Sequence, residues 1–151
     1  MRDLPWTGHF DAAFCFGNSF SYFDDEQNLR FLKAVRGALK PGGRFALETH
    51  FVAETVFGQL QSKRWFPVGD LIFLHDTSYD PPSGTITSTY RIIRGGKMEE
   101  KQAVYRVYTY RELRRLVESA GFGVLESYGS LTREPLRIGS PGLWLIARRP
   151  E

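Results

Sequence analysis

The residues best suited to chemistry follow two apolar runs whose ends would meet at one edge of a sheet. Gly17-Asn18-Ser19 comes directly after the run Phe10–Phe16, and His50 lies at the end of the run Arg44–Phe51. Glycine lets a ligand approach the backbone, and histidine is the side chain whose ordinary pKa suits proton transfer near neutral pH. Ligands of open α/β sheets bind beyond the carboxyl ends of parallel strands, so the two loops predict one cleft.

Within this cleft His50 is the candidate general base, with Glu48 on the same face because side chains alternate along a strand. Tyr22 is the second candidate base, and together with Phe23 it would line an apolar pocket. Simpler interpretations stay open: a hydrogen-bonded structural histidine, and a Gly17-Asn18 pair that only turns the chain while the aromatic residues pack in the core.

Glycine motifs that would settle a reaction class are not matched. Gly37 and Gly42 have the spacing of a phosphate-binding loop, but Gly43-Arg44 stands where that loop needs Lys followed by Ser or Thr. Gly121-Phe122-Gly123 follows a predicted helix rather than a strand, which a dinucleotide-binding fingerprint requires. The sequence therefore contains neither of these two nucleotide-binding motifs.

A serine hydrolase and a metal enzyme are also disfavoured. The stretch Gly17–Ser21 has Ser21 where a nucleophile elbow needs glycine, and no histidine follows His75 to complete a triad. The histidines are scattered, without neighbouring cysteine or paired carboxylates at ligand spacing. We therefore expect no metal site.

Composition predicts a single globular domain over residues 1–151. The chain is 42% hydrophobic, which suffices for one sizeable core at this length. Its N-terminus has no apolar signal region, and no run approaches the roughly 18 apolar residues of a membrane span. The single Cys15 excludes an internal disulfide and suits a reducing compartment. We therefore expect a cytoplasmic protein with no membrane partner.

The charge gives little indication of a polyanionic partner. A net charge of +3 is too small to predict nucleic-acid binding by itself. Arg111, Arg114 and Arg115 form a basic patch on one predicted helix, for which a solvated helix face is the simpler interpretation. We expect no nucleic-acid partner.

The elements that would position the cleft form a strand–helix–strand unit. Asp24, with Gln27 three residues later, marks the start of a helix, and Lys40-Pro41-Gly42-Gly43 marks its end. A helix between two short apolar runs indicates a βαβ unit with parallel strands and a right-handed crossover. The fold class that follows is α/β.

The second half of the chain predicts an antiparallel β-meander, then a helix and two closing strands. Thr109 would start the helix and Gly121 would end it. The aromatic and cationic side chains of the meander would either cover a substrate or pack at its core and edges. The expected strands are Leu71–Tyr79, Thr85–Arg94 and Met98–Tyr108 in the meander, and Val124–Tyr128 and Leu143–Arg148 at the end.

Three ordered stretches carry a resemblance to a known family. They are Phe10–Phe16, Leu39–Phe45, and Tyr108-Thr109 through Glu112-Leu113 to Ala120-Gly121-Phe122. In this order and spacing they resemble the later half of class I S-adenosylmethionine-dependent methyltransferases, over nearly the whole chain. The resemblance implies a partial Rossmann-like sheet of parallel strands with a C-terminal antiparallel hairpin. It also implies that residues 64–108 are an inserted antiparallel region that covers the substrate.

The resemblance also implies which residues meet the cofactor, S-adenosylmethionine, and the substrate, a small-molecule methyl acceptor. Phe16, Gly17, Asn18 and Ser19 would touch the methionine and ribose side of the cofactor. Within Arg2–Trp6, Asp3 and Leu4 would lie near adenine. Transfer in line needs mostly orientation and exclusion of water, with His50 as base and Tyr22 in reserve.

The chain departs from the family because it has no glycine-rich loop after a first strand and no acidic residue ending a second strand. At roughly 30 residues per βα unit, two or more units of the family pattern are missing. We therefore expect a C-terminal portion that is inactive without the preceding segment. The run Phe10–Phe16 would be an unpaired sheet edge, which predicts self-association. The alternative function is a non-catalytic, methyltransferase-like interaction module that pairs through this edge.

Overall fold

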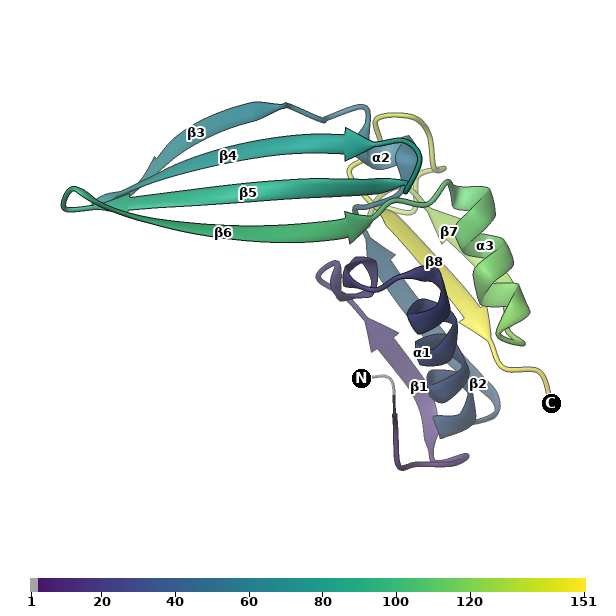
Figure 1. The fold of residues 1–151 in the computed structure, drawn as a ribbon. Helices are drawn as coiled ribbons and strands as arrows, with labels where there is room; N and C mark the ends of the chain where they lie inside the picture. Colours follow the sequence, from purple (N-terminus) through teal and green to yellow (C-terminus); the bar gives the residue numbers. More distant parts are fainter. Residues whose placement is uncertain (1–2) are drawn as a thin grey trace.

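The computed structural model describes residues 3–151 and contains two four-stranded sheets (Figure 1). The body sheet has the order β1-β2-β8-β7, and the second sheet, which we call the cap, has the order β3-β4-β5-β6. The body strands are β1 Phe10–Cys15, β2 Leu39–Thr49, β7 Gly123–Tyr128 and β8 Leu143–Arg148. The cap strands are β3 Lys63–Val68, β4 Leu71–Asp80, β5 Thr85–Arg94 and β6 Lys97–Arg106.

The predicted βαβ unit is confirmed. Strand β1 pairs in parallel with β2, and helix α1 (Asp25–Ala38) connects them. The side chain of Asp24 accepts a hydrogen bond from the backbone N–H of Gln27 at 2.8 Å and thereby caps the helix. Strand β2 begins at Leu39, earlier than predicted, because the residues between Leu39 and Arg44 form a bulge opposite β1.

The C-terminal part completes the body sheet as expected. Strand β8 pairs antiparallel with both β2 and β7. Helix α3 (Tyr110–Ser119) begins with a capping box, in which the Thr109 hydroxyl and the Glu112 carboxylate satisfy each other's backbone N–H groups. Helices α1 and α3 share one apolar core with the sheet, built around Leu32, Phe45, Leu113 and Leu145.

The cap has four strands where the sequence predicted three. The additional strand, β3, has every residue exposed and contains Pro67, so its sequence lacks the alternation of polar and apolar residues that marks a half-buried strand. Proline is tolerated there because β3 is an edge strand. Two short helices were also not predicted: a 3-10 helix at Ser19–Tyr22, and α2 at Ala53–Val56.

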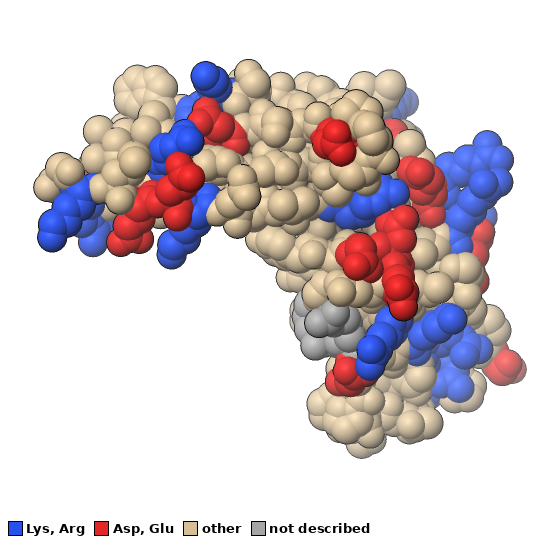
Figure 2. Space-filling model, in the orientation of Figure 1, with Lys and Arg blue, Asp and Glu red and all other residues tan. Residues whose placement is uncertain are grey.

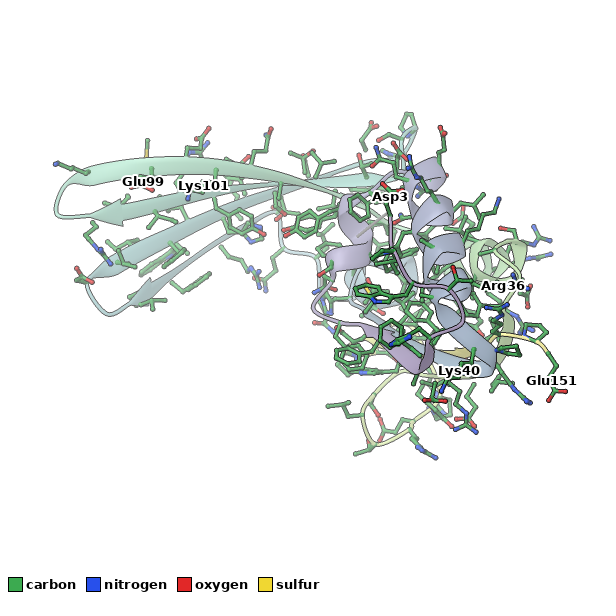
Figure 3. The ribbon with its side chains drawn as sticks, turned by 90° about the horizontal axis from the view of Figure 1, so that it is seen from below. Asp3, Arg36, Lys40, Glu99, Lys101 and Glu151 are labelled. Carbon is green, nitrogen blue, oxygen red and sulfur yellow. The ribbon has the colours of Figure 1, made fainter. Side chains whose placement is uncertain are left out.

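The cap projects beyond the carboxyl ends of the parallel strands β1 and β2 (Figure 1), and Figure 3 shows it extending away from the body. In the space-filling view the two parts meet at an angle, which leaves a notch on the side of β1 (Figure 2). A small second core lies at the junction and includes Val56, Ile86 and Tyr105. None of the helices within residues 3–151 combines the length and apolar character needed to cross a bilayer.

Candidate active site at the carboxyl ends of β1 and β2

The loops after β1 and β2 lie side by side, as predicted, and hydrogen bonds join them. The backbone N–H of Gly17 donates to the carboxylate of Glu48 at 2.7 Å. In the other direction, the backbone N–H of His50 donates to the Asn18 side-chain oxygen at 2.5 Å. These long-range bonds fix the two loops relative to each other.

The loop after β1 turns sharply because two consecutive residues adopt left-handed backbone conformations. Gly17 has φ +73° and Asn18 has φ +64°, a region that glycine enters freely and asparagine tolerates better than most residues. A Cβ atom added at Gly17 would meet nothing within 4 Å, so the backbone there borders open space. The Gly17-Asn18 pair therefore turns the chain and also leaves room for a ligand beside the loop.

Two buried hydroxyl groups connect the two loops on their buried side. Ser21 and Thr49 lie with their hydroxyl oxygens 3.0 Å apart, and both side chains are buried. The Thr49 hydroxyl also accepts a hydrogen bond from the backbone N–H of Phe51 at 3.1 Å. Since each buried polar group has a partner, the loops are held without an unsatisfied polar group at this point.

His50 is oriented by a backbone carbonyl from a distant part of the chain. Its Nδ1 lies 2.7 Å from the carbonyl oxygen of Pro141, to which it must donate because a carbonyl only accepts. Among the described residues Nε2 has no hydrogen-bond partner. In the neutral ring this leaves the lone pair on Nε2, the form a general base needs.

The Pro141 carbonyl is in reach because α2 and the C-terminal loop approach closely. The N–H of Gly139 donates to the carbonyl of Glu54 at 2.8 Å. A Cβ added at Gly58 would lie 2.8 Å from the Cα of Gly139, so only glycine fits between these segments. The close contact sets the position of Pro141 and, through it, the His50 ring.

A cavity of about 180 Å³ opens beside His50, between the end of β2, α2 and the cap. Its walls combine apolar groups such as Phe51, Val56 and Ile86 with polar groups. This composition suits a small organic molecule. The polar side chains that the argument below uses are His50, Arg64, His75, Thr77 and Tyr90.

Tyr22 does not share this cavity. It is 54% exposed and lines a larger, open cleft of about 500 Å³, together with Asp24, Asp25 and Arg106. Its hydroxyl lies 3.2 Å from that of Tyr105, which in turn lies 3.3 Å from that of Tyr90. The structure therefore separates the two candidate bases, although this chain of hydroxyl groups connects their surroundings.

Tyr105 is one of the residues that join the cap to the body. Its ring stacks on Phe51 with centroids 4.1 Å apart and planes 8° apart. Burial, followed by the hydrogen bonds to Tyr22 and Tyr90, raises the pKa of the Tyr105 phenol above its ordinary value. Tyr105 is therefore neutral across the physiological range.

The two residues predicted near adenine lie beside α1. Asp3 forms an exposed ion pair with Arg30 at 2.5 Å, and Leu4 packs against the body core. Among the described residues no hydrogen bond joins either of them to the loop Phe16–Ser19. Arg2, which belongs to the same predicted segment, lies outside the described residues.

His75 is a site residue that the sequence analysis noted only as part of a scattered set. It is 9% exposed and stacks on Tyr90 with centroids 4.5 Å apart. Its Nδ1 accepts from the Arg64 guanidinium at 3.2 Å, so in the neutral ring its Nε2 donates to the Thr77 hydroxyl at 3.0 Å. Only the pairing of β3 with β4 brings Arg64 opposite His75, and β3 was not predicted.

We predict that His75 titrates below its ordinary value of 6.5. Burial first, and then repulsion by Arg64, lower its pKa, whereas Asp76 acts in the opposite sense. Because the unfolded chain then binds the proton more readily than the folded chain, stability falls as the pH drops from about 6.5 to the folded pKa. An NMR titration of the imidazole signals measures this pKa. A pKa of His75 above 6.5 would contradict the geometry. His75→Gln should remove the part of the pH dependence of stability that His75 causes.

No three His, Cys, Asp or Glu side chains within residues 3–151 are grouped as metal ligands would be. The site is instead built from backbone amides, the Glu48 carboxylate, the Asn18 amide, hydroxyl groups, imidazoles and one guanidinium. Such groups can orient a small molecule and take up a proton.

Comparisons with known proteins show which solved structures share this fold. No protein-family model matches the sequence. No curated protein matches it either. The structure, however, is similar to that of the CcbJ methyltransferase from Streptomyces caelestis, with a TM-score of 0.82 and 17% identity, over 99% of this chain and 60% of that one.

Two further solved structures agree. An S-adenosylmethionine-dependent methyltransferase from Clostridium acetobutylicum has a TM-score of 0.83 and 13% identity, over 99% of this chain and 62% of that one. CalS10, an amino pentose methyltransferase from Micromonospora echinaspora solved with S-adenosylmethionine bound, has a TM-score of 0.68 and 16% identity, over 98% of this chain and 61% of that one. The chain thus has the fold of class I methyltransferases and spans about three fifths of the length of these structures.

Proposed function

We propose that this chain forms the acceptor-binding part of an S-adenosylmethionine-dependent methyltransferase that acts on a small molecule. The observation that carries the proposal is the joined pair of loops after β1 and β2, bonded through Gly17–Glu48 and Asn18–His50, beside a 180 Å³ cavity. The position agrees with the rule that ligands of open α/β sheets bind beyond the carboxyl ends of the parallel strands.

The loop Phe16–Ser19 is proposed to contact the cofactor. Gly17 borders open space, and Phe16 is half exposed, so both are accessible to a ligand. Asn18 already uses its side-chain oxygen on His50, which leaves its amide NH₂ for a ligand. The Ser19 hydroxyl donates to the Phe16 carbonyl at 3.3 Å and can still accept a hydrogen bond from a ligand. When bound, the cofactor supplies an electrophilic methyl group on sulfur. Asp3 and Leu4 are proposed for its adenine side, on the resemblance alone.

His50 is proposed as the base that receives the proton of the acceptor's nucleophile. Its Nδ1 is bonded to Pro141, its Nε2 has no hydrogen-bond partner within residues 3–151, and the residue lines the cavity. The body and cap walls would orient the acceptor and exclude water, which is most of what a methyl transfer in line requires. Tyr22 remains the second candidate, but its hydroxyl is directed to Tyr105 and its ring lines the other cleft.

We further propose that these 151 residues form only one wall of the cofactor site and are inactive by themselves. Within the described chain, β1 is the edge of the body sheet, so the loop after β1 has a neighbouring loop on one side only. A cofactor at an α/β sheet is normally held from several strand ends. Binding of the cofactor to this chain alone is therefore expected to be weak.

A thermal-shift titration with S-adenosylhomocysteine tests the proposed cofactor loop. At ten times its dissociation constant the ligand adds about 1.4 kcal/mol, or roughly 3–6 °C for a domain of this size. Phe16→Ala should abolish the rise, whereas Phe66→Ala, a similarly exposed cap residue, should keep it. No rise in the folded parent chain, or an equal rise in Phe16→Ala, would refute the proposal.

A second candidate function is pairing with another chain through the edge of β1. The edge of β1 lies on the side of the notch between body and cap (Figures 1 and 2). Phe14 on this strand is 75% exposed. Unpaired strand edges with exposed apolar groups favour association. Light scattering should give about twice the monomer mass of 17.3 kDa, and Ala12→Lys should return the monomer. A monomer at high concentration would exclude self-association.

A further inference from the structure

One cross-strand row of the cap brings cationic and hydrogen-bonding side chains together on the cavity side. Arg64 on β3 pairs with His75 on β4, His75 pairs with Tyr90 on β5, and Tyr90 pairs with Lys101 on β6. Residues directly opposite each other on neighbouring strands share one face of a sheet. Three of the four line the cavity beside His50, and Lys101 ends the row because β6 is the edge strand of the cap. Figure 3 shows Lys101 on the cap.

The positive charge of this row has no acidic partner among residues 3–151. Arg64 donates to His75, and neither Arg64 nor Lys101 forms an ion pair with a described carboxylate. On the opposite face of the cap, Arg91 does have acidic partners, because it forms ion pairs with both Asp76 and Glu100. The guanidinium of Arg91 is therefore paired with acidic groups, whereas that of Arg64 at the cavity has no counter-charge in the part of the chain that the structure describes.

His75 holds Arg64 in place without adding or removing charge. Both of its ring nitrogens are bonded, one to Arg64 and one to Thr77, and its ring is stacked on Tyr90. A neutral ring with Nδ1 as acceptor is the form compatible with a guanidinium donor. Arg64 still has further N–H groups, because a guanidinium carries five donors and this contact uses one.

We propose that the cavity recognises a carboxylate group on the methyl acceptor, with Arg64 as its charge partner. A guanidinium matches the two oxygens of a carboxylate, and a cavity of about 180 Å³ holds a small ring or chain that carries one. A phosphate is less well matched, because neither a helix N-terminus nor a glycine-rich loop lines the cavity to serve its third oxygen. The binding of a carboxylate in this cavity is argued from the structure itself. The inference rests on the proposed function only where it identifies the bound molecule as the methyl acceptor.

The test uses benzoate as the probe and benzamide as its uncharged counterpart. The chain contains three histidines, so a ¹⁵N-histidine-labelled sample gives one set of imidazole signals each for His9, His50 and His75. Benzoate should shift the His75 and His50 signals in a saturable way and leave His9 unchanged. Benzamide should bind at least tenfold more weakly, since it lacks the charge.

Arg64→Gln should weaken benzoate binding at least tenfold, whereas Arg94→Gln should leave it unchanged, because Arg94 pairs with Asp70 at the end of the cap. Equal binding of benzoate and benzamide, an unaffected Arg64→Gln variant, or tenfold tighter binding of phenyl phosphate than of benzoate would overturn the proposal. Loss of benzoate binding with S-adenosylhomocysteine binding intact would refute this inference alone. The reverse result would refute the proposed function alone.

Discussion

Phe45→Ala is expected to lower the free energy of unfolding by about 3–5 kcal/mol, which is the range for removing a large aromatic side chain from a packed core. Phe45 is fully buried at the centre of β2. Its ring stacks on Phe122 at 5.6 Å and meets Phe31 at 6.4 Å, so the substitution leaves a cavity where both helices and the sheet converge. A domain of this size should lose roughly 10 °C or more of its melting temperature.

Phe14→Ala is the matched control, since it removes the same side chain from the neighbouring strand. Phe14 is 75% exposed on the opposite face of the body sheet, so its loss should change the free energy of unfolding by no more than about 0.5 kcal/mol. Urea denaturation measures both variants. Equal costs for the two substitutions would contradict the described packing, or would show that a second chain covers Phe14.

His50→Gln is expected to reduce the rate of methyl transfer about 10²- to 10⁴-fold in the assembled enzyme, because it removes the proposed base. The glutamine side chain keeps a polar atom near the position of Nε2 but is not basic. Transfer of a radiolabelled methyl group from S-adenosylmethionine measures the effect. Binding of the acceptor should change much less than the turnover rate, since the proton moves only during the reaction.

His50→Asn separates the base from the structural role of this residue. The asparagine amide can still donate to the Pro141 carbonyl as Nδ1 does, but it has no group at the Nε2 position. Both variants should therefore lose activity to a similar extent, about 10²- to 10⁴-fold. His50→Asn should keep the free energy of unfolding within about 0.5 kcal/mol of the parent value. Full activity in either variant would leave His50 with only a structural role.

The elements with strong local signals could be predicted from the sequence. Asp24 and Thr109 cap their helices as the patterns indicated, and the strand–helix–strand unit pairs in parallel. The edge strand β3 could not be predicted, because an exposed strand containing Pro67 carries no periodic burial signal. The register between the strands of the cap could not be predicted either, because it depends on which residues of separate strands pair with each other.

For the candidate site, too, local features could be predicted and long-range contacts could not. The meeting of the Gly17-Asn18 loop with His50 was predicted from the rule for parallel strand ends and is confirmed by their hydrogen bonds. The tautomer of His50 could not be predicted, because Pro141 reaches it from 91 residues away along the chain. The role of His75 depends on Arg64 in the strand that the sequence did not reveal.

The central claim is that the cofactor meets this chain at the loop after β1, next to His50. Backbone amide NMR during titration with S-adenosylhomocysteine tests it most directly, because shifts can be mapped even for weak binding. The account predicts saturable shifts at Gly17, Asn18, Ser19 and His50, with the tip of the cap near Gly95 unchanged. Shifts confined to the cap, or none at any residue of the loop Phe16–Ser19, would contradict it.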